Sequence, residues 1–161
     1  MQNIVLIGFM GCGKSTLARE LGRVSGRFVL DSDMLIEQRE GISVAEYFAR
    51  YGEGAFRERE REFIDWVESS VHGAIISTGG GMSAHNSVKP MGIVVYLDMA
   101  FERICARLSQ SDLAKRPLFG DRTKALELFT KRQAIYQAQA DITLNAELEI
   151  AALVSALDPL L

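Results

Sequence analysis

Short apolar runs alternate with longer stretches of helical spacing along most of the chain. The apolar runs are rich in β-branched residues and predict buried β-strands at 4–7, 28–30, 74–76, 93–97 and 142–144. The spacing of apolar positions predicts helices at 14–24, 43–51, 55–69, 101–108, 124–139 and 147–157. Buried strands that alternate with helices favour an α/β fold around a five-stranded parallel sheet.

Two local patterns support the predicted helices at 43–51 and 55–69. Ser43 is followed three residues later by Glu46, a capping box that marks a helix start. Phe56, Phe63 and Val67 recur at helical spacing and form one apolar stripe on the second of these helices.

Two segments fit neither a strand nor a helix. Residues 77–90 contain three consecutive glycines, and residues 109–122 are polar. Loops of this length in a compact domain are usually functional. Ligands of parallel sheets lie beyond the carboxyl ends of the strands, so the residues that follow each strand are the ones to inspect.

Composition and charge narrow the class of protein. A length of 161 residues, with 48% hydrophobic and 24% charged residues, predicts one globular domain over 1–161. A net charge of −3 disfavours a nucleic-acid or anionic-membrane surface. Cys12 and Cys105 have neither zinc-ligand spacing nor a CxxC pair, which favours a reducing compartment. No run of about 20 apolar residues is present and the apolar start is too short for a signal peptide, so we expect a cytoplasmic protein.

The sequence GFMGCGKS at 8–15 follows a predicted strand and precedes a predicted helix. This is the GxxxxGK[ST] phosphate loop in its required context, so we set aside a chance glycine turn. Lys14 would reach the β- and γ-phosphates and Ser15 would offer its hydroxyl to Mg²⁺. Thr16 would lie near the α-phosphate or face solvent, and we interpret Cys12 as a small neutral filler rather than a redox switch.

Carboxylates and glycines follow the next two strands. Asp31 and Asp33 follow the second predicted strand, where one can serve a metal's water shell while the other binds substrate hydroxyls. The alternative is that one of them only caps a helix. Residues 79–81 are all glycine, which permits close backbone approach and N–H donation to an oxyanion or hydroxyl, or else forms a plain turn.

Three arginines are candidate ligands for an anion. Arg57 lies in a run of alternating charges, most of which we expect to form a solvated helix face with i,i+3 and i,i+4 pairs. Arg116 lies in the polar segment and would close over the phosphates, or else is a surface residue. Arg132 and Tyr136 are four residues apart on a predicted helix, a spacing that also fits simple surface packing.

Taken together, these motifs resemble the shikimate kinase family over nearly the whole chain. The matching segments are GFMGCGKST at 8–16, DSD at 31–33, GEGAFRERE at 52–60, STGGG at 77–81, KRPL at 115–118 and RQAIY at 132–136. Each motif alone is shared with other P-loop proteins, whereas all six in this order are highly specific.

The resemblance implies a three-layer αβα, nucleoside-monophosphate-kinase-like fold with strand order 2-3-1-4-5. It also implies that the chain transfers the γ-phosphate of ATP to shikimate and uses one Mg²⁺ per subunit. The protein would be a monomer. An acceptor-binding region would cover about 33–61, and a lid about 109–122.

The resemblance also implies roles for individual residues. The nucleotide would be bound by Gly11, Cys12, Gly13, Lys14, Ser15, Thr16, Arg107 and Arg116. The acceptor would be bound by Asp33, Arg57, Gly79, Gly80, Gly81 and Arg132, with Gly80 as an N–H donor. The catalytic residues would be Lys14, Asp33 and Arg116. Ser15 would ligate Mg²⁺ directly and Asp31 through water.

Two other classes remain as alternatives. Another small-molecule P-loop kinase, for gluconate or a nucleoside monophosphate, would share the phosphate loop but not the set of arginines suited to a carboxylate. A silent ATP-binding module would bind the nucleotide without acceptor-dependent turnover.

The sequence departs from the family pattern in two places. Residues 141–147 lack the basic residue that some members of the family place near adenine, and within 109–122 only KRPL matches clearly.

Overall fold

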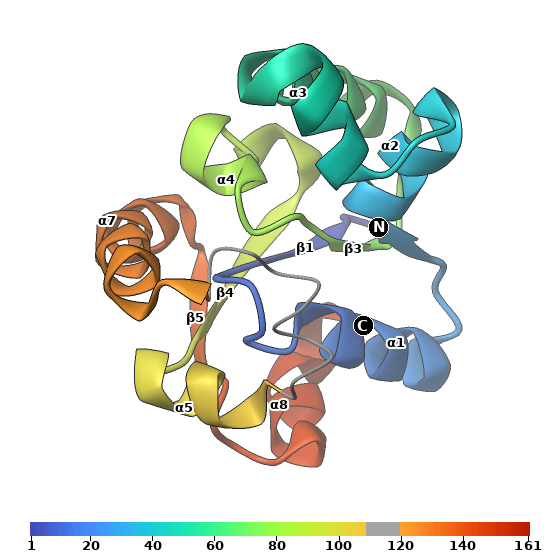
Figure 1. The fold of residues 1–161 in the computed structure, drawn as a ribbon. Coiled ribbons are helices and arrows are strands. Elements are labelled where there is room, and N and C mark those ends of the chain that lie inside the picture. The colour runs from blue at the N-terminus through green and yellow to red at the C-terminus, as the bar shows by residue number, and fades with distance from the viewer. Residues whose placement is uncertain (109–119) are drawn as a thin grey trace.

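The computed structural model describes residues 1–108 and 120–161. Its centre is a five-stranded sheet in the order β2-β3-β1-β4-β5, which confirms the predicted topology (Figure 1). All neighbouring strands run parallel. Arg116 and most of the predicted lid lie outside the described residues.

The middle of the sheet is completely buried and its edges are not. The strands are β1 Ile4–Ile7, β2 Val29–Asp31, β3 Ile75–Ser77, β4 Ile93–Asp98 and β5 Ile142–Asn145. Every residue of β1 is 0% exposed because β3 and β4 flank it on both sides.

The prediction that all five runs are fully buried is wrong for the two edge strands. Phe28 is 86% exposed and precedes β2 instead of belonging to it. In β5, Thr143 and Asn145 are exposed while their neighbours are half-buried. An edge strand has a neighbour on one side only, so apolar residues in it do not guarantee burial.

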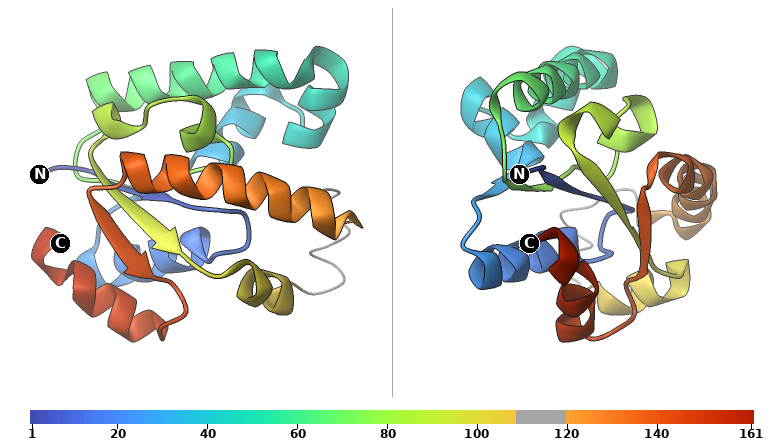
Figure 2. Two further views of the ribbon diagram at one scale, coloured as in Figure 1. Left: turned by 90° about the vertical axis from the view of Figure 1, so that its left-hand side faces the viewer. Right: turned by 180° about the vertical axis from the view of Figure 1, so that it is seen from behind.

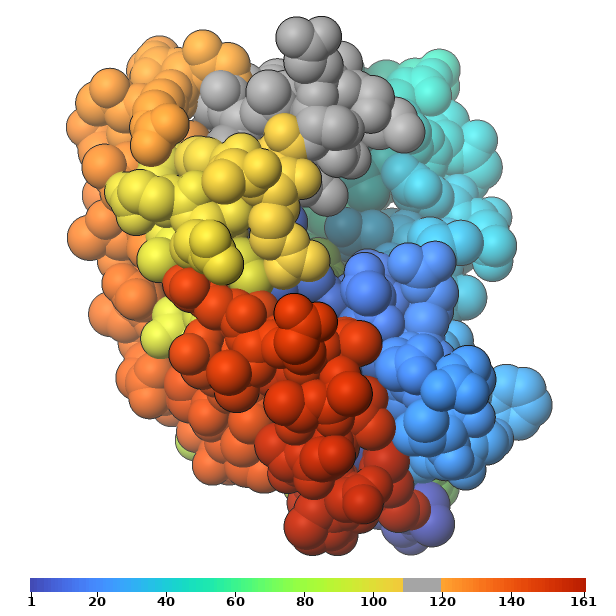
Figure 3. Space-filling view, turned by 90° about the horizontal axis from the view of Figure 1, so that it is seen from below, coloured from blue at the N-terminus to red at the C-terminus, as the bar shows by residue number. Residues whose placement is uncertain are grey.

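Helices cover both faces of the sheet (Figures 1 and 2). The helices are α1 Lys14–Ser25, α2 Ser32–Glu40, α3 Val44–Ser70, α4 Met82–His85, α5 Phe101–Arg107, α7 Arg122–Gln139 and α8 Ile150–Leu157, with short 3₁₀ turns at Lys89–Met91 and Asp158–Leu160. Helices α1 and α8 pack side by side on one face, as Figure 3 shows in blue and red. Helices α3, α4 and α7 pack on the other. Within the described part of the chain, every helix is too short or too polar to cross a membrane.

Helix α3 joins the two helices that the sequence predicts separately. The break between them is retained at Gly52, whose φ of 82° and ψ of 164° are not helical. The predicted start is confirmed, because the hydroxyl of Ser43 accepts a 3.2 Å hydrogen bond from the Glu46 amide. The predicted stripe is also confirmed: Phe56, Phe63 and Val67 are all buried.

Helix α2 is absent from the elements that the sequence predicts. Asp31 caps its first turn by accepting hydrogen bonds from the Asp33 amide at 3.1 Å and the Met34 amide at 3.2 Å. Gly41 ends the helix in the left-handed conformation, with φ 73°. The helix interior has no clear apolar periodicity, so only its two ends carry a sequence signal.

Candidate active site

The phosphate loop connects β1 to α1 and depends on glycine at two positions. A β-carbon at Gly8 would lie 2.9 Å from the carbonyl oxygen of Leu97, so the loop can pass β4 only without a side chain. Gly13 has φ 104° and precedes α1, which points the first free amides of the helix into the loop. The local sequence therefore builds an anion-binding concavity directly after the central strand.

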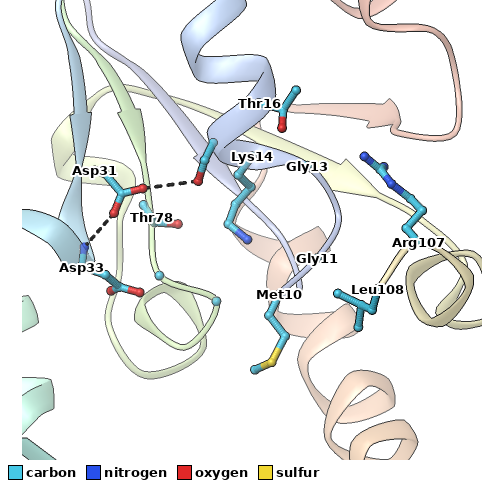
Figure 4. Close-up of a pocket in the computed structure, with 13 residues that line it drawn as sticks. Met10, Gly11, Gly13, Lys14, Thr16, Asp31, Asp33, Thr78, Arg107 and Leu108 are labelled. Atoms are coloured by element: carbon cyan, nitrogen blue, oxygen red, sulfur yellow. Dashed lines mark hydrogen bonds between the residues drawn. The ribbon is translucent and has the colours of Figure 1, made fainter. Parts of the chain in front are cut away.

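Lys14 folds back over this loop instead of reaching solvent. Its ammonium donates hydrogen bonds to the carbonyl oxygens of Gly8 at 2.8 Å and Phe9 at 3.1 Å, and the residue is 7% exposed. Figure 4 shows the ammonium between the carboxylates of Asp31 and Asp33 on one side and Arg107 on the other. A positive charge thus lies in the loop that would hold a polyphosphate.

Ser15 lies beside two further side-chain oxygen atoms. Its hydroxyl is 3.3 Å from Oδ2 of Asp31 and 3.2 Å from the hydroxyl of Ser77. The other carboxylate oxygen of Asp31 caps α2, so the capping interpretation of Asp31 is confirmed and still leaves one oxygen facing Ser15. Among the described residues no group of three or more His, Cys, Asp or Glu side chains gathers to hold a metal. Hydroxyl and carboxylate oxygens in small number fit Mg²⁺, which usually keeps several waters and binds substrate phosphates as well.

A cavity of about 340 Å³ extends from the phosphate loop toward β3 and α2 (Figure 4). It is lined by Met10, Gly11, Gly13, Lys14, Ser15, Thr16, Asp31, Asp33, Thr78, Gly79, Gly80, Arg107 and Leu108. Predicted nucleotide-binding and acceptor-binding residues therefore share one cavity.

A second cavity of about 450 Å³ adjoins the first on the far side of Arg107. Cys12, Gly13 and Thr16 line it together with apolar side chains that include Leu97 and Leu153. Arg107 borders both cavities, so it can contact a ligand in either one. The apolar part of this lining, which lies beside charged residues such as Arg103 and Glu147, suits a flat nucleobase.

Asp33 points into the first cavity from the start of α2. Burial raises its pKa to about 6, and the nearby negative charge of Asp31 adds to the rise, while Lys14 opposes it. A β-carbon at Gly79 would collide with Oδ1 of Asp33, so glycine is required for the carboxylate to sit against this backbone. A carboxylate with a raised pKa in a cavity is a common property of functional residues.

Arg57 is fixed by two glutamates of its own helix. Its Nη1 donates to both carboxylate oxygens of Glu60 at 2.8 Å, and its Nη2 donates to Oε1 of Glu53 at 2.5 Å. Arg57 is 13% exposed and Glu60 only 1%. Burial raises the pKa of Glu60 to about 7 against the opposing effect of Arg57. The guanidinium lies against Gly81, where a β-carbon would be 2.5 Å from Nη2.

The charge run around Arg57 is therefore not uniformly solvated. The expected i,i+3 pairs are present: Arg59 with Glu62 at 3.0 Å and Arg61 with Glu58 at 3.1 Å. The pair of Arg57 and Glu60 is the buried member of this series.

Arg132 and Tyr136 reach the same glycines from α7. Both are buried, and both donate to the carbonyl oxygen of Gly80, Arg132 at 3.3 Å and Tyr136 at 2.6 Å. The alternative of simple surface packing for this pair is wrong. The helix after the predicted lid thus holds the glycine segment in place.

The three predicted acceptor-binding side chains converge on residues 79–81. Asp33 lies against Gly79, Arg132 against Gly80 and Arg57 against Gly81. Sequence reasoning missed the parts played by Glu53 and Glu60, and it paired Tyr136 with Arg132 without assigning Tyr136 a contact. A signal was available, because Glu53 and Glu60 lie four and three residues from Arg57, and Tyr136 lies four residues from Arg132.

A phosphate loop between the first strand and first helix of a parallel sheet, sharing a cavity with the carboxylate of Asp33 and with Gly79 and Gly80, defines a P-loop phosphotransferase.

The comparisons with known proteins specify the family. The family model described as shikimate kinase matches residues 10–157. The shikimate kinase of Helicobacter hepaticus is 47% identical over 154 residues, which cover 94% of this chain and 92% of that protein. A shikimate kinase of Clostridium botulinum strain Okra is 39% identical over 155 residues, with 92% and 91% covered. The chain belongs to the shikimate kinase family.

Experimental structures agree with this assignment. The shikimate kinase of Acinetobacter baumannii in complex with shikimate superposes with a TM-score of 0.86 at 31% identity, covering 99% of this chain and 92% of that one. The shikimate kinase of Bacteroides thetaiotaomicron gives a TM-score of 0.88 at 30% identity, with 99% and 97% covered.

Proposed function

We propose that this chain transfers the γ-phosphate of ATP to a hydroxyl of shikimate, giving shikimate 3-phosphate and ADP. The observation that carries the proposal is the convergence of Asp33, Arg57 and Arg132 on residues 79–81, of which Gly79 and Gly80 line the same cavity as Lys14. Shikimate is a carboxylated polyol, and this set offers guanidinium groups for the carboxylate and a carboxylate for the hydroxyls. Family membership and the solved structure of a relative in complex with shikimate support the same acceptor.

On the nucleotide side, main-chain amides of the loop would wrap the phosphates and Lys14 would exchange its carbonyl partners for phosphate oxygens. Ser15 would hold Mg²⁺ directly and Asp31 through water. When bound, Mg²⁺ would supply charge neutralisation on the β- and γ-phosphates. Thr16 and Arg107, which border the second cavity, would contact the remainder of the nucleotide.

On the acceptor side, Asp33 would accept a hydrogen bond from the attacking hydroxyl. Its pKa of about 6 keeps it largely ionised at neutral pH and close enough to the working pH to take up a proton as the oxygen–phosphorus bond forms. Alignment alone also accelerates a loose phosphoryl transfer, so Asp33 acts first by positioning. Arg116, outside the described residues, would be the arginine that reaches the transferred phosphate.

We further propose that Mg²⁺ is the metal used, that the chain works as a monomer in the cytoplasm, and that it binds neither nucleic acid nor membranes. The net charge of −3 supports the last point, because polyanion binding rests on excess positive charge. Light scattering on the purified chain tests the monomer, and replacement of Mg²⁺ by Ca²⁺ in the assay tests the metal.

The experiment that tests the function is an ADP-release assay with shikimate, gluconate and AMP as competing acceptors. We expect efficient turnover with shikimate alone. Equal or faster turnover with gluconate or AMP would assign the chain to a different acceptor. ATP binding with no acceptor-dependent turnover would instead identify a silent nucleotide-binding module.

A further inference from the structure

Arg57 has one edge left for an incoming carboxylate. Its Nη1 is engaged by both oxygens of the buried Glu60, and its Nε is buried without a hydrogen-bond partner among the described residues. The backbone of Gly81 lies against the guanidinium. Among the described residues Nη2 is the guanidinium nitrogen whose carboxylate partner is exposed instead of buried, so an organic acid that binds Arg57 would bind there.

Glu53 already occupies this edge. Its Oε1 accepts from Arg57 Nη2 at 2.5 Å and lies 3.6 Å from Nε2 of His85. Its pKa is lowered mainly by the hydrogen bond from Arg57, with further contributions from the charges of Arg57, His85 and Arg132. The carboxylate of Glu53 therefore lies within the field of the same two arginines that would grip the carboxylate of the acceptor.

The two glutamates on Arg57 differ in how easily they can be displaced. Glu60 is 1% exposed, and separating it from Arg57 would leave a buried charge without a partner, which is costly. Glu53 is 54% exposed, and exposed ion pairs contribute little. Glu53 also follows the non-helical Gly52 directly, and the space around Gly54 is open. Glu53 can therefore turn into solvent while Glu60 keeps Arg57 in place.

We propose that Glu53 is an internal competitor of the substrate: it occupies the acid-binding edge of Arg57 until the carboxylate of the acceptor displaces it. Glu53 thereby sets the affinity for the acceptor and excludes weaker monovalent acids from Arg57. This inference rests on the proposed function, since it takes shikimate as the displacing acid.

The test is Glu53→Gln in the full-length chain, with the dissociation constant of shikimate measured calorimetrically and its KM measured in the ADP-release assay. An amide keeps the shape of the side chain but removes the competing charge. We expect both constants to fall about two- to fivefold, the range that corresponds to an exposed ion pair. Glu58→Gln is the matched control: Glu58 is 57% exposed on the same helix and pairs with Arg61, so it changes the net charge equally without touching Arg57.

A second acceptor separates competition from a structural effect. The methyl ester of shikimate has no negative charge to compete with Glu53, so its binding should be equal in the variant and the parent chain. Unchanged or weaker shikimate binding in Glu53→Gln, an equal gain in Glu58→Gln, or an equal gain for the ester would each overturn the inference. A parent chain that neither binds nor phosphorylates shikimate would overturn the proposed function itself, and the inference with it.

Discussion

Replacing the carboxylate of Asp33 by an amide should stabilise the protein while it removes activity. The pKa of Asp33 rises from its ordinary value of 3.8 to about 6, chiefly because the folded protein buries it. One pH unit corresponds to about 1.4 kcal/mol, so the ionised carboxylate lowers the free energy of unfolding by at most roughly 3 kcal/mol. Because Asp33 is partly exposed and solvent screens part of this effect, we expect about 1–2 kcal/mol.

The pH dependence gives the prediction its sign. Below about pH 4 the carboxyl group is protonated in both the folded and the unfolded chain, so Asp33 has no effect on stability. Between pH 3.8 and about pH 6 the carboxyl group of Asp33 is ionised in the unfolded chain but still largely protonated in the folded one, so the free energy of unfolding falls as the pH rises. Above about pH 6 the loss is complete. The amide side chain of the Asp33→Asn variant does not titrate, so the advantage of the variant should be absent at pH 4 and full at pH 7.

The assay is urea denaturation of the parent chain and Asp33→Asn at several pH values between 4 and 7.5, with Asp65→Asn as a control at an exposed position of α3. The difference between the parent chain and Asp33→Asn should grow with pH, while the control should show no such trend. Phosphorylation of shikimate should fall by a factor of about 100 or more in Asp33→Asn. Equal stability of parent and variant at pH 7, or a gain that is the same at pH 4 and pH 7, would refute the reasoning.

Three further substitutions test other contacts of the site. Gly81→Ala would place a β-carbon 2.5 Å from Nη2 of Arg57, and should raise the KM for shikimate at least about fivefold with the KM for ATP unchanged. Its control is Gly54→Ala, where the added β-carbon meets no atom within 4 Å. Equal kinetics in the two variants would contradict the contact. Tyr136→Phe removes the 2.6 Å hydrogen bond that holds the glycine segment, and should weaken shikimate binding several-fold in calorimetry, whereas an effect on ATP alone would argue against it. Lys14→Ala should lower kcat at least about 100-fold while shikimate binding persists, and near-parental turnover would remove Lys14 from the reaction.

The central part of the fold could be predicted because each signal there is local. β1, the phosphate loop and α1 follow from an apolar run, glycines at fixed positions and a helical pattern. The edges of the sheet could not be predicted in the same way. Phe28 has the composition of a strand but lies outside one and is exposed, because burial depends on which strands become neighbours.

The candidate site shows the same division. The loop residues could be placed from their motif, whereas the run around Arg57 gave no means to distinguish a buried glutamate from an exposed one. Glu60 is buried and Glu58 exposed although they are two residues apart, since only Glu60 lies on the face of α3 that packs against the rest of the protein. The selection of Arg57 and Arg132 as acceptor ligands came from the resemblance to a family, and their roles stay predictions.

The contacts of Lys14 have a consequence for the energetics of nucleotide capture. The carbonyl oxygens of Gly8 and Phe9 already hold the ammonium, so the loop keeps its curvature before any phosphate arrives. Binding of the nucleotide then exchanges the hydrogen-bond partners of Lys14 in a loop that is already formed. The conformational entropy of ordering this loop is lost during folding and not again on binding.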